Sequence, residues 1–305
     1  MNLSGVYPAL TTPFAADGSV SLSDLKHNIS KYNETELAGY VVIGSTGESV
    51  LLSREEADRI LSTVRESASP EKRLIAGTGA ESTLETIERT KRAAELGYHV
   101  ALVKTPYYYK PVYTSEVLIA HYRRVADASP IPVLLYSVPQ FTGIALEPAD
   151  VAALAEHPNI IGMKDSSGNV QKLTDTITSV PPAFQILVGS ASTVFPSLVL
   201  GARGAILALA CALPELCVAL FDAVRSGQME KARELQASVV PASNLMVSRY
   251  GIAGVKYAMD LGGYRGGVPR LPLQPLKEEQ KGAIRDLHAK VGVFETARLS
   301  GRASV

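Results

Sequence analysis

Short apolar runs alternate with amphipathic segments along roughly the first 225 residues of the chain. Most of these runs are apolar nearly throughout, which is typical of parallel strands covered on both faces rather than of strands with one face in solvent. We expect eight of them to form strands, at residues 5–13, 39–45, 74–79, 100–105, 132–138, 160–166, 185–190 and 204–208.

The segments between these runs carry signals for the start of a helix. Ser21, Ser53 and Ser82 each precede such a segment, and each is followed three positions later by an acidic residue, which is the pattern of an N-capping serine. The apolar spacing after Ser82 predicts a helix that ends near Gly97. Strands and helices in this alternation predict a (β/α)8 barrel, which we assign to residues 1–226 as the catalytic domain.

The remainder of the chain, residues 227–305, has a different pattern. Residues 229–240 and 278–293 have helical periodicity, and a turn-rich connection with four glycines and three prolines lies between them at residues 262–275. No further β-rich run follows. We therefore predict a C-terminal helical domain over residues 227–305, with a tail that frays from Leu299.

Charge and cysteine content narrow the class of protein. Lys and Arg number 30, as do Asp and Glu, so the formal net charge is zero and neither nucleic acid nor an anionic membrane is an expected partner. The N-terminus has no signal or transit pattern, and no run is long and apolar enough to predict a membrane span. Two cysteines, Cys211 and Cys217, lie in an apolar segment, which fits a reducing, cytoplasmic environment.

A lysine within an apolar run is the first candidate for chemistry. Active sites of (β/α)8 barrels lie at the C-terminal ends of the strands, and Lys164 stands near the end of the sixth run. Burying an ammonium group is costly, and desolvation favours the neutral amine, which is a nucleophile toward ketones. Alternation places Ser166 on the same face and Asp165 on the opposite, structural face. The alternative is a strand-end lysine that extends to solvent.

Two other strand ends carry hydroxyl groups. The second run ends in Gly44-Ser-Thr-Gly47, where the hydroxyls of Ser45 and Thr46 stand beside accessible backbone N–H groups that suit a carboxylate. An ordinary glycine-rich turn explains the same pattern. The fifth run ends at Tyr136, whose phenol can transfer protons to a reacting carbonyl. A core tyrosine with its hydroxyl in water is the alternative there.

Signals for metals and cofactors are missing from the sequence. The five histidines are scattered, with no metal-ligand spacing among themselves or with the two cysteines. The chain has neither a complete dinucleotide fingerprint nor a Walker motif. We therefore expect no metal and no cofactor, and a metal-dependent aldolase is disfavoured.

Four motifs occur in a familiar order: Gly44-Ser-Thr-Gly-Glu48, Thr105-Pro-Tyr-Tyr-Tyr109, Tyr136-Ser-Val-Pro139 and Gly162-Met-Lys-Asp-Ser166. Together they resemble the dihydrodipicolinate synthase / N-acetylneuraminate lyase family of class I aldolases, over nearly the whole chain. The resemblance implies a (β/α)8 barrel with a C-terminal helical domain, assembled as a homotetramer that is a dimer of dimers.

The resemblance also implies roles for individual residues. Lys164 would form the imine with pyruvate or a pyruvate-bearing substrate, and Tyr136 would transfer protons. Ser45 and Thr46 would bind the pyruvyl carboxylate through hydroxyl and backbone N–H groups. Tyr108 of a neighbouring subunit would complete a proton relay with the hydroxyl of the second-strand motif, although three consecutive tyrosines leave the register open by one position.

Further positions match residues that line the pocket in this family. They are Gly189 and the carbonyl of Ile206 at the eighth strand, for which the match implies a substrate-binding role. Ser166 is a further expected substrate-binding residue, because alternation places it on the same face as Lys164.

The residue at the position of Phe141 differs between members of the family. Synthases that condense pyruvate with aspartate semialdehyde usually have an arginine there, and its loss should cost roughly 2–5 kcal/mol of binding unless another cation replaces it. The segment Gly189-Ser-Ala-Ser192 offers no carboxylate for the long polyol of a sialic acid. The motifs around Tyr136 and Lys164 look most like those of 4-hydroxy-2-oxoglutarate aldolases, which have asparagine at the position of Phe141.

These comparisons lead to one predicted reaction. It is the reversible cleavage of a 4-hydroxy-2-oxo acid, either 4-hydroxy-2-oxoglutarate or a 2-keto-3-deoxy sugar acid, to pyruvate and an aldehyde. A dihydrodipicolinate synthase is the alternative, followed by a non-catalytic barrel that binds a 2-oxo acid.

Overall fold

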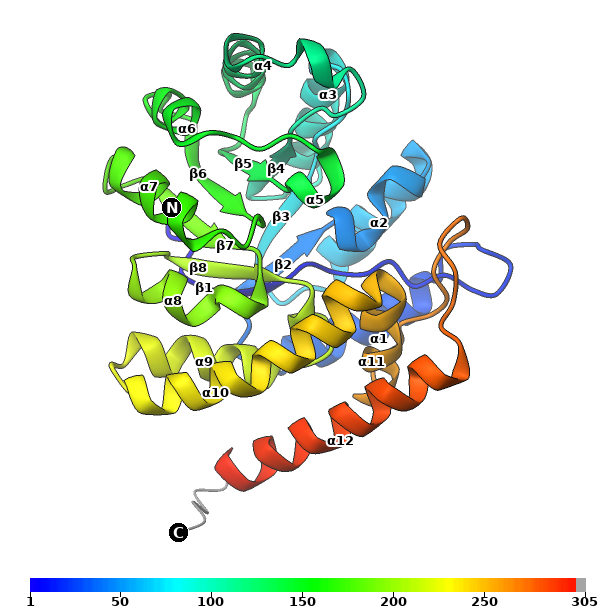
Figure 1. Ribbon diagram of the computed structural model, residues 1–305. Coiled ribbons are helices and arrows are strands. Elements are labelled where there is room, and N and C mark those ends of the chain that lie inside the picture. The colour runs from blue at the N-terminus through cyan, green and yellow to red at the C-terminus, as the bar shows by residue number, and fades with distance from the viewer. Residues whose placement is uncertain (300–305) are drawn as a thin grey trace.

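Parallel strands form a barrel that is surrounded by helices (Figure 1). The computed structural model describes residues 1–299. The eight strands are β1 (Gly5–Pro8), β2 (Gly39–Val42), β3 (Arg73–Gly77), β4 (Val100–Lys104), β5 (Val133–Ser137), β6 (Ile160–Asp165), β7 (Gln185–Val188) and β8 (Gly204–Leu207). They are hydrogen-bonded in the order β1-β8-β7-β6-β5-β4-β3-β2, and a bridge between Ala9 and Val41 joins β1 to β2. The predicted (β/α)8 barrel is confirmed.

Every predicted strand is present, but each ends before its predicted boundary. The largest difference is in the first strand, which ends at Pro8 rather than at Pro13. The second strand ends at Val42 because the chain turns at Ile43, where φ is 51°. Apolar residues at the mouth of the barrel therefore continue the hydrophobic pattern after the strand ladder has ended.

Helices of the barrel alternate with these strands. They are α1 (Leu22–Asn33), α2 (Arg54–Ser67), α3 (Thr83–Glu95), α4 (Ser115–Ala128), α5 (Pro139–Thr142), α6 (Pro148–Ala155), α7 (Val170–Ser179), α8 (Val194–Val199) and α9 (Pro214–Arg225). Ser21, Ser53 and Ser82 accept hydrogen bonds from the backbone N–H three residues later, which confirms all three predicted N-caps.

The C-terminal part is helical, as predicted. It contains α10 (Met229–Ala242), a π-helical turn (Ser243–Arg249), α11 (Gly251–Leu261) and α12 (Glu278–Leu299). The sequence pattern missed α11 because glycines interrupt it, but a Cβ on Gly254 would lie 2.3 Å from the carbonyl oxygen of Met246, so this helix needs glycine for close packing.

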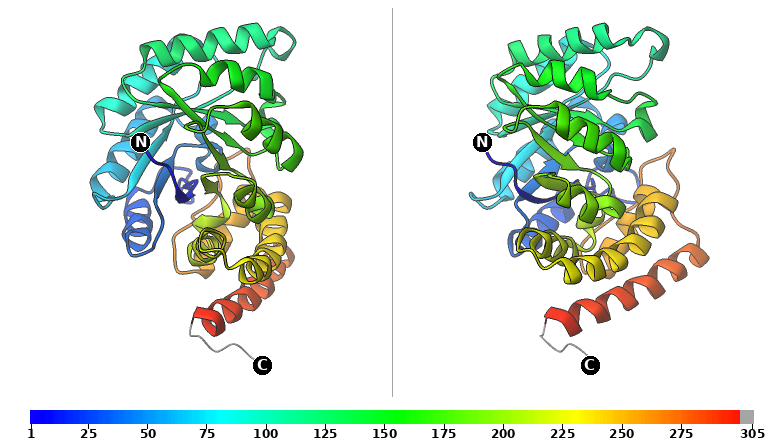
Figure 2. Two further views of the ribbon diagram at one scale, coloured as in Figure 1. Left: turned by 90° about the vertical axis from the view of Figure 1, so that its left-hand side faces the viewer. Right: turned by 60° about the vertical axis from the view of Figure 1, so that its left-hand side comes forward.

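The C-terminal helices cover one side of the barrel. α10 packs against α9, and α12 lies on the outer side of α10 and α11 (Figure 2). The division at residue 226 stays a prediction. The tail predicted to fray begins at Leu299, the last residue of α12, and its other residues lie outside the described part of the chain.

The structure also bears on membrane spans and on the two cysteines. No helix within residues 1–299 is long and apolar enough to cross a membrane. Cys211 and Cys217 are both buried.

Apolar side chains fill the inside of the barrel. They include Tyr7, Val41, Leu102, Leu134 and Leu187, one from each of five strands. Because inward-facing positions alternate along a strand, the next inward residues toward the C-terminal ends of β4 and β5 are polar. The bottom of the barrel is therefore a packed core, and the polar groups gather at its mouth.

Candidate active site

Lys164 on β6 is buried at the mouth of the barrel. Its side chain is 4% exposed, and its Nζ lies 4.3 Å from the ring centroid of Tyr136 on β5. The two residues are register partners in the sheet, so they share the inward face. Among residues 1–291, whose side chains are described, no acidic side chain pairs with Lys164. The alternative of a lysine that extends to solvent is therefore wrong.

The backbone after β2 is strained into a tight turn, residues 44–48, which we call the 44–48 turn. Ile43, just before the turn, and Glu48, its last residue, have φ values of 51° and 56°, which residues other than glycine rarely adopt, least of all the β-branched Ile43. Gly77 accommodates this path, because a Cβ there would lie 2.3 Å from the carbonyl oxygen of Ile43. The turn presents Ser45, whose Oγ lies 3.4 Å from the hydroxyl of Tyr136.

Buried charges from the C-terminal part anchor the 44–48 turn. The carboxylate of Glu48 forms an ion pair with Lys256 of α11 at 2.6 Å, and the exposed fractions of the two side chains are 0% and 1%. Glu48 also accepts a hydrogen bond from the backbone N–H of Arg270 at 2.8 Å. The Arg270 guanidinium binds Glu56 at 2.6 Å and lowers the pKa of that carboxyl to about 2. Sequence reasoning missed this network, although Lys256 lies in an apolar helix.

A cavity of about 340 Å³ brings together seven of the nine predicted site residues. Residues from the C-terminal part, including Ser243 and Ile252, complete its wall. A Cβ on Gly189 would lie 2.0 Å from the Oγ of Ser166, so glycine leaves room for this hydroxyl. The predicted residues on the wall are Ser45, Thr46, Tyr136, Phe141, Lys164, Ser166 and Gly189.

Two predicted residues lie elsewhere. Tyr108 is 73% exposed, and its backbone N–H donates to Glu81, so the loop after β4 holds it outside this cavity. Ile206 is fully buried in the barrel interior, and Ala208 and Leu209 form the β8 side of the cavity instead. The position of a residue at a strand end does not predict how far its side chain lies above the barrel core. It also does not predict whether the side chain contributes to the site of its own subunit or to that of a neighbour.

Lys104 on β4 was missed by the sequence analysis. It is the register partner of Tyr136 and therefore shares the inward face with Tyr136. A Cβ on Gly79 would lie 2.9 Å from the Cγ of Lys104, so the glycine makes room for the lysine side chain. Burial lowers the pKa of Lys104, an effect that Glu81 opposes. The signal was available, because Lys104 ends an apolar run just as Lys164 does.

The site combines an amine, a phenol and hydroxyl groups within one cavity. A buried lysine without an acidic partner can attack a ketone, and a neighbouring phenol can transfer the protons that this reaction moves. No group of three or more His, Cys, Asp or Glu side chains in the described part of the chain is arranged to hold a metal ion.

Comparisons with known proteins agree with this geometry. The family model of the "Dihydrodipicolinate synthetase family" matches residues 2–290. A 4-hydroxy-tetrahydrodipicolinate synthase of an Exiguobacterium species is 38% identical over 273 residues, covering 90% of this chain and 92% of that protein. A probable mitochondrial 4-hydroxy-2-oxoglutarate aldolase of Emericella nidulans is 37% identical over 287 residues, covering 92% of this chain and 93% of that protein.

A solved structure shares the fold. The chloride-inhibited dihydrodipicolinate synthase of Acinetobacter baumannii, in complex with pyruvate, superposes with a TM-score of 0.91 at 32% identity, covering 95% of this chain and 99% of that one. The chain therefore belongs to the dihydrodipicolinate synthetase family and is a lyase of the class I aldolase type.

Proposed function

We propose that this enzyme reversibly cleaves a 4-hydroxy-2-oxo acid, 4-hydroxy-2-oxoglutarate or a 2-keto-3-deoxy sugar acid, to pyruvate and an aldehyde through an imine at Lys164. One observation carries the proposal. Lys164 is buried without an acidic partner, 4.3 Å from the ring centroid of Tyr136. A protein gains no stability from a buried, unpaired amine, so its presence favours a chemical role.

The imine makes the carbon–carbon bond cleavable. The amine of Lys164 attacks C2 of the substrate, and the resulting carbinolamine loses water as the phenol of Tyr136 protonates the departing hydroxyl. The iminium then accepts electrons. When the C4 hydroxyl gives up its proton, the C3–C4 bond breaks, the aldehyde leaves, and the electron pair remains as an enamine. Protonation at C3 and hydrolysis release pyruvate and restore the free amine.

The residues around Lys164 hold the substrate in this proposal. Ser45 and Thr46 bind the C1 carboxylate, and both line the cavity with Ser166. The strain of the 44–48 turn supports this role, because a fixed turn holds its N–H and hydroxyl groups in place before the substrate arrives.

The assembly is also part of the proposal. We propose a homotetramer, built as a dimer of dimers, in which Tyr108 of a neighbouring subunit relays protons with Thr46. The 73% exposure of Tyr108 supports a contact made by another chain. We also propose that Gly189, on the cavity wall, and the backbone carbonyl of Ile206, whose side chain is buried in the barrel core, contact the substrate. The two buried cysteines in an apolar segment fit the proposed cytoplasmic location.

A second candidate is the condensation of pyruvate with aspartate semialdehyde. The name of the Exiguobacterium relative, 38% identical, supports it. Both reactions use the same imine and differ in the aldehyde. Phe141 on α5 lines the cavity and is 68% exposed, at the position where such synthases usually have an arginine, so we place the aldolase first. A non-catalytic barrel that binds a 2-oxo acid is the third candidate function.

Reductive trapping tests the imine. Pyruvate and borohydride should add the mass of reduced pyruvate to one peptide, which contains Lys164, as read by mass spectrometry. A folded protein without this adduct would contradict the proposal and favour the binding barrel. Release of pyruvate from 4-hydroxy-2-oxo acids, measured beside condensation with aspartate semialdehyde, then separates the first two candidates.

Replacing Tyr136 by phenylalanine should lower kcat by at least about 100-fold while KM changes little. The ring beside Lys164 remains, but the proton donor is gone. Steady-state kinetics of pyruvate release measure the effect, with Tyr113→Phe, outside the cavity, as the matched control. An unchanged kcat in Tyr136→Phe would show that another group transfers the proton.

A further inference from the structure

We propose that Lys104 binds an anionic group, a carboxylate, at the aldehyde end of the substrate. This inference rests on the proposed function and names the class of substrate for the same site. Three independent observations support it: the place of Lys104 in the sheet, the cavity that it lines, and the ion pairs that occupy three nearby arginines.

The register of the sheet sets three polar residues side by side. Lys104 pairs with Tyr136, and Tyr136 pairs with Lys164, across the adjacent strands β4, β5 and β6. Neighbouring strands are about 4.8 Å apart, so the backbone of Lys104 lies roughly 10 Å from that of Lys164. A substrate bound to Lys164, with its reacting hydroxyl at Tyr136, can reach Lys104 with its far end.

An adjoining cavity connects these positions. It has a volume of about 290 Å³, and it shares Ser45 and Phe141 with the cavity of Lys164. Most of its remaining wall is apolar, and its basic residue is Lys104. Glu48 also reaches this wall, but its charge is compensated by Lys256 at 2.6 Å. A carboxylate that enters the cavity therefore meets a single available cation in apolar surroundings, where charges attract more strongly than in water.

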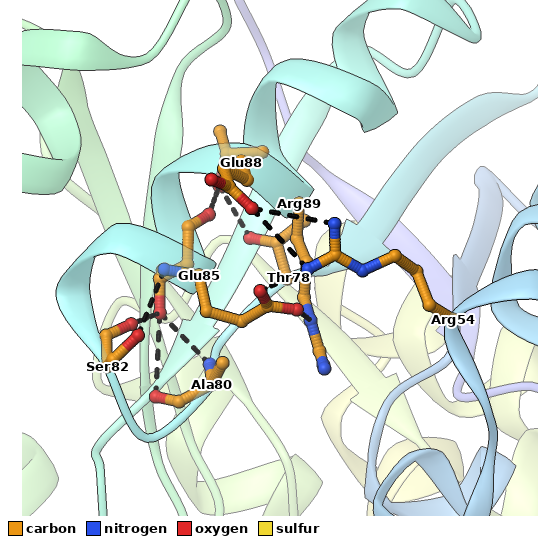
Figure 3. Close-up of polar contacts among 9 residues, drawn as sticks. Arg54, Thr78, Ala80, Ser82, Glu85, Glu88 and Arg89 are labelled. Carbon is orange, nitrogen blue, oxygen red and sulfur yellow. Dashed lines mark hydrogen bonds and ion pairs between the residues drawn. The ribbon is translucent and has the colours of Figure 1, made fainter.

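The three arginines of a neighbouring cavity already have acidic partners. This smaller cavity of about 170 Å³, which Ser45, Lys104 and Tyr136 also line, is bounded by the three arginines. Arg54 and Arg89 both bind Glu85 (Figure 3), the latter at 2.7 Å. Arg92 binds Asp58 at 2.9 Å. None of the three is free to replace the arginine that is missing at the position of Phe141.

Lys104 itself has no such partner. Among the side chains described, those of residues 1–291, the amine of Lys104 forms no hydrogen bond and no ion pair, and its Nζ lies over the ring of Tyr107, 4.9 Å from the centroid. The charged groups that influence it are Glu81 and Arg89. Glu81 already accepts hydrogen bonds from the backbone N–H groups of Tyr107 and Tyr108. The amine is therefore available for a substrate carboxylate.

The test uses two uncleavable 2-oxo acids that differ only at the far end. 2-Oxoglutarate carries a carboxylate there, and 2-oxopentanoate carries a methyl group. In the wild-type enzyme, the concentration that half-saturates borohydride trapping at Lys164 should be at least about 30-fold lower for 2-oxoglutarate. Lys104→Met should remove this preference, and Lys104→Arg should restore part of it. Lys91→Met, an exposed lysine on α3, is the matched control.

Each outcome has a separate meaning. A wild-type enzyme that traps neither of these acids nor pyruvate overturns the imine and with it the proposed function. A wild-type enzyme that traps pyruvate but neither longer acid overturns the role of Lys104 alone. A wild-type enzyme that traps both acids without preference overturns the role of Lys104 alone. The same holds if Lys104→Met weakens trapping of both acids equally, because the lysine would then act through Tyr136 and not on the substrate carboxylate. Pyruvate, which lacks the far end, should be trapped equally by the wild type and Lys104→Met.

Discussion

Replacing Lys164 by methionine is expected to lower pyruvate release by at least about a thousandfold and to abolish the borohydride adduct. Methionine retains the length of the apolar stem but cannot form an imine, so no other step of the reaction can begin. Kinetics and mass spectrometry of the same preparation measure both losses. Because the change removes a buried amine that has no acidic partner, we expect the melting temperature to stay the same or to rise.

Lys26→Met is the control for this variant, because Lys26 is exposed on α1, away from the cavity. It should trap pyruvate and release product like the wild type. Retained activity in Lys164→Met, with the fold intact by circular dichroism, would contradict the mechanism. Lys104 would then be the next candidate for the nucleophile.

Replacing Lys256 by methionine is expected to lower the free energy of unfolding by about 3–5 kcal/mol. The change leaves the carboxylate of Glu48 buried, with the backbone N–H of Arg270 as its remaining partner. Urea unfolding followed by circular dichroism measures the loss as a lower transition midpoint. Since Glu48 ends the 44–48 turn, the same variant should raise the concentration of pyruvate that half-saturates trapping at Lys164.

A double variant separates charge from packing. Glu48→Gln combined with Lys256→Met removes both charges, so it should be more stable than Lys256→Met alone. Lys281→Met, which breaks an exposed ion pair on α12, should leave the midpoint unchanged. Equal losses in the single and double variants would mean that packing of the lysine stem, and not the buried ion pair, stabilises this part of the fold.

Much of the fold could be predicted because its signals are local. The eight apolar runs, the three capping serines and the position of Lys164 within a run can each be recognised in a window of a few residues. The boundaries were less accurate where the backbone leaves the ladder, as at Ile43, because an apolar side chain at the barrel mouth looks the same as one in a strand. α11 was missed because Gly254, which the packing requires, weakens the helical pattern.

The sequence by itself determined the alternation of strands and helices and the placing of Lys164 and Tyr136 at strand ends, since both follow from the periodicity of neighbouring residues. Only the tertiary structure decided which strand ends meet. It aligned Lys104 with Tyr136 through the register of β4 and β5, and it joined Arg270 to Glu48, which are 222 positions apart. Register and such distant contacts depend on how the barrel closes and how the C-terminal helices pack on it, and no local window of sequence contains that information.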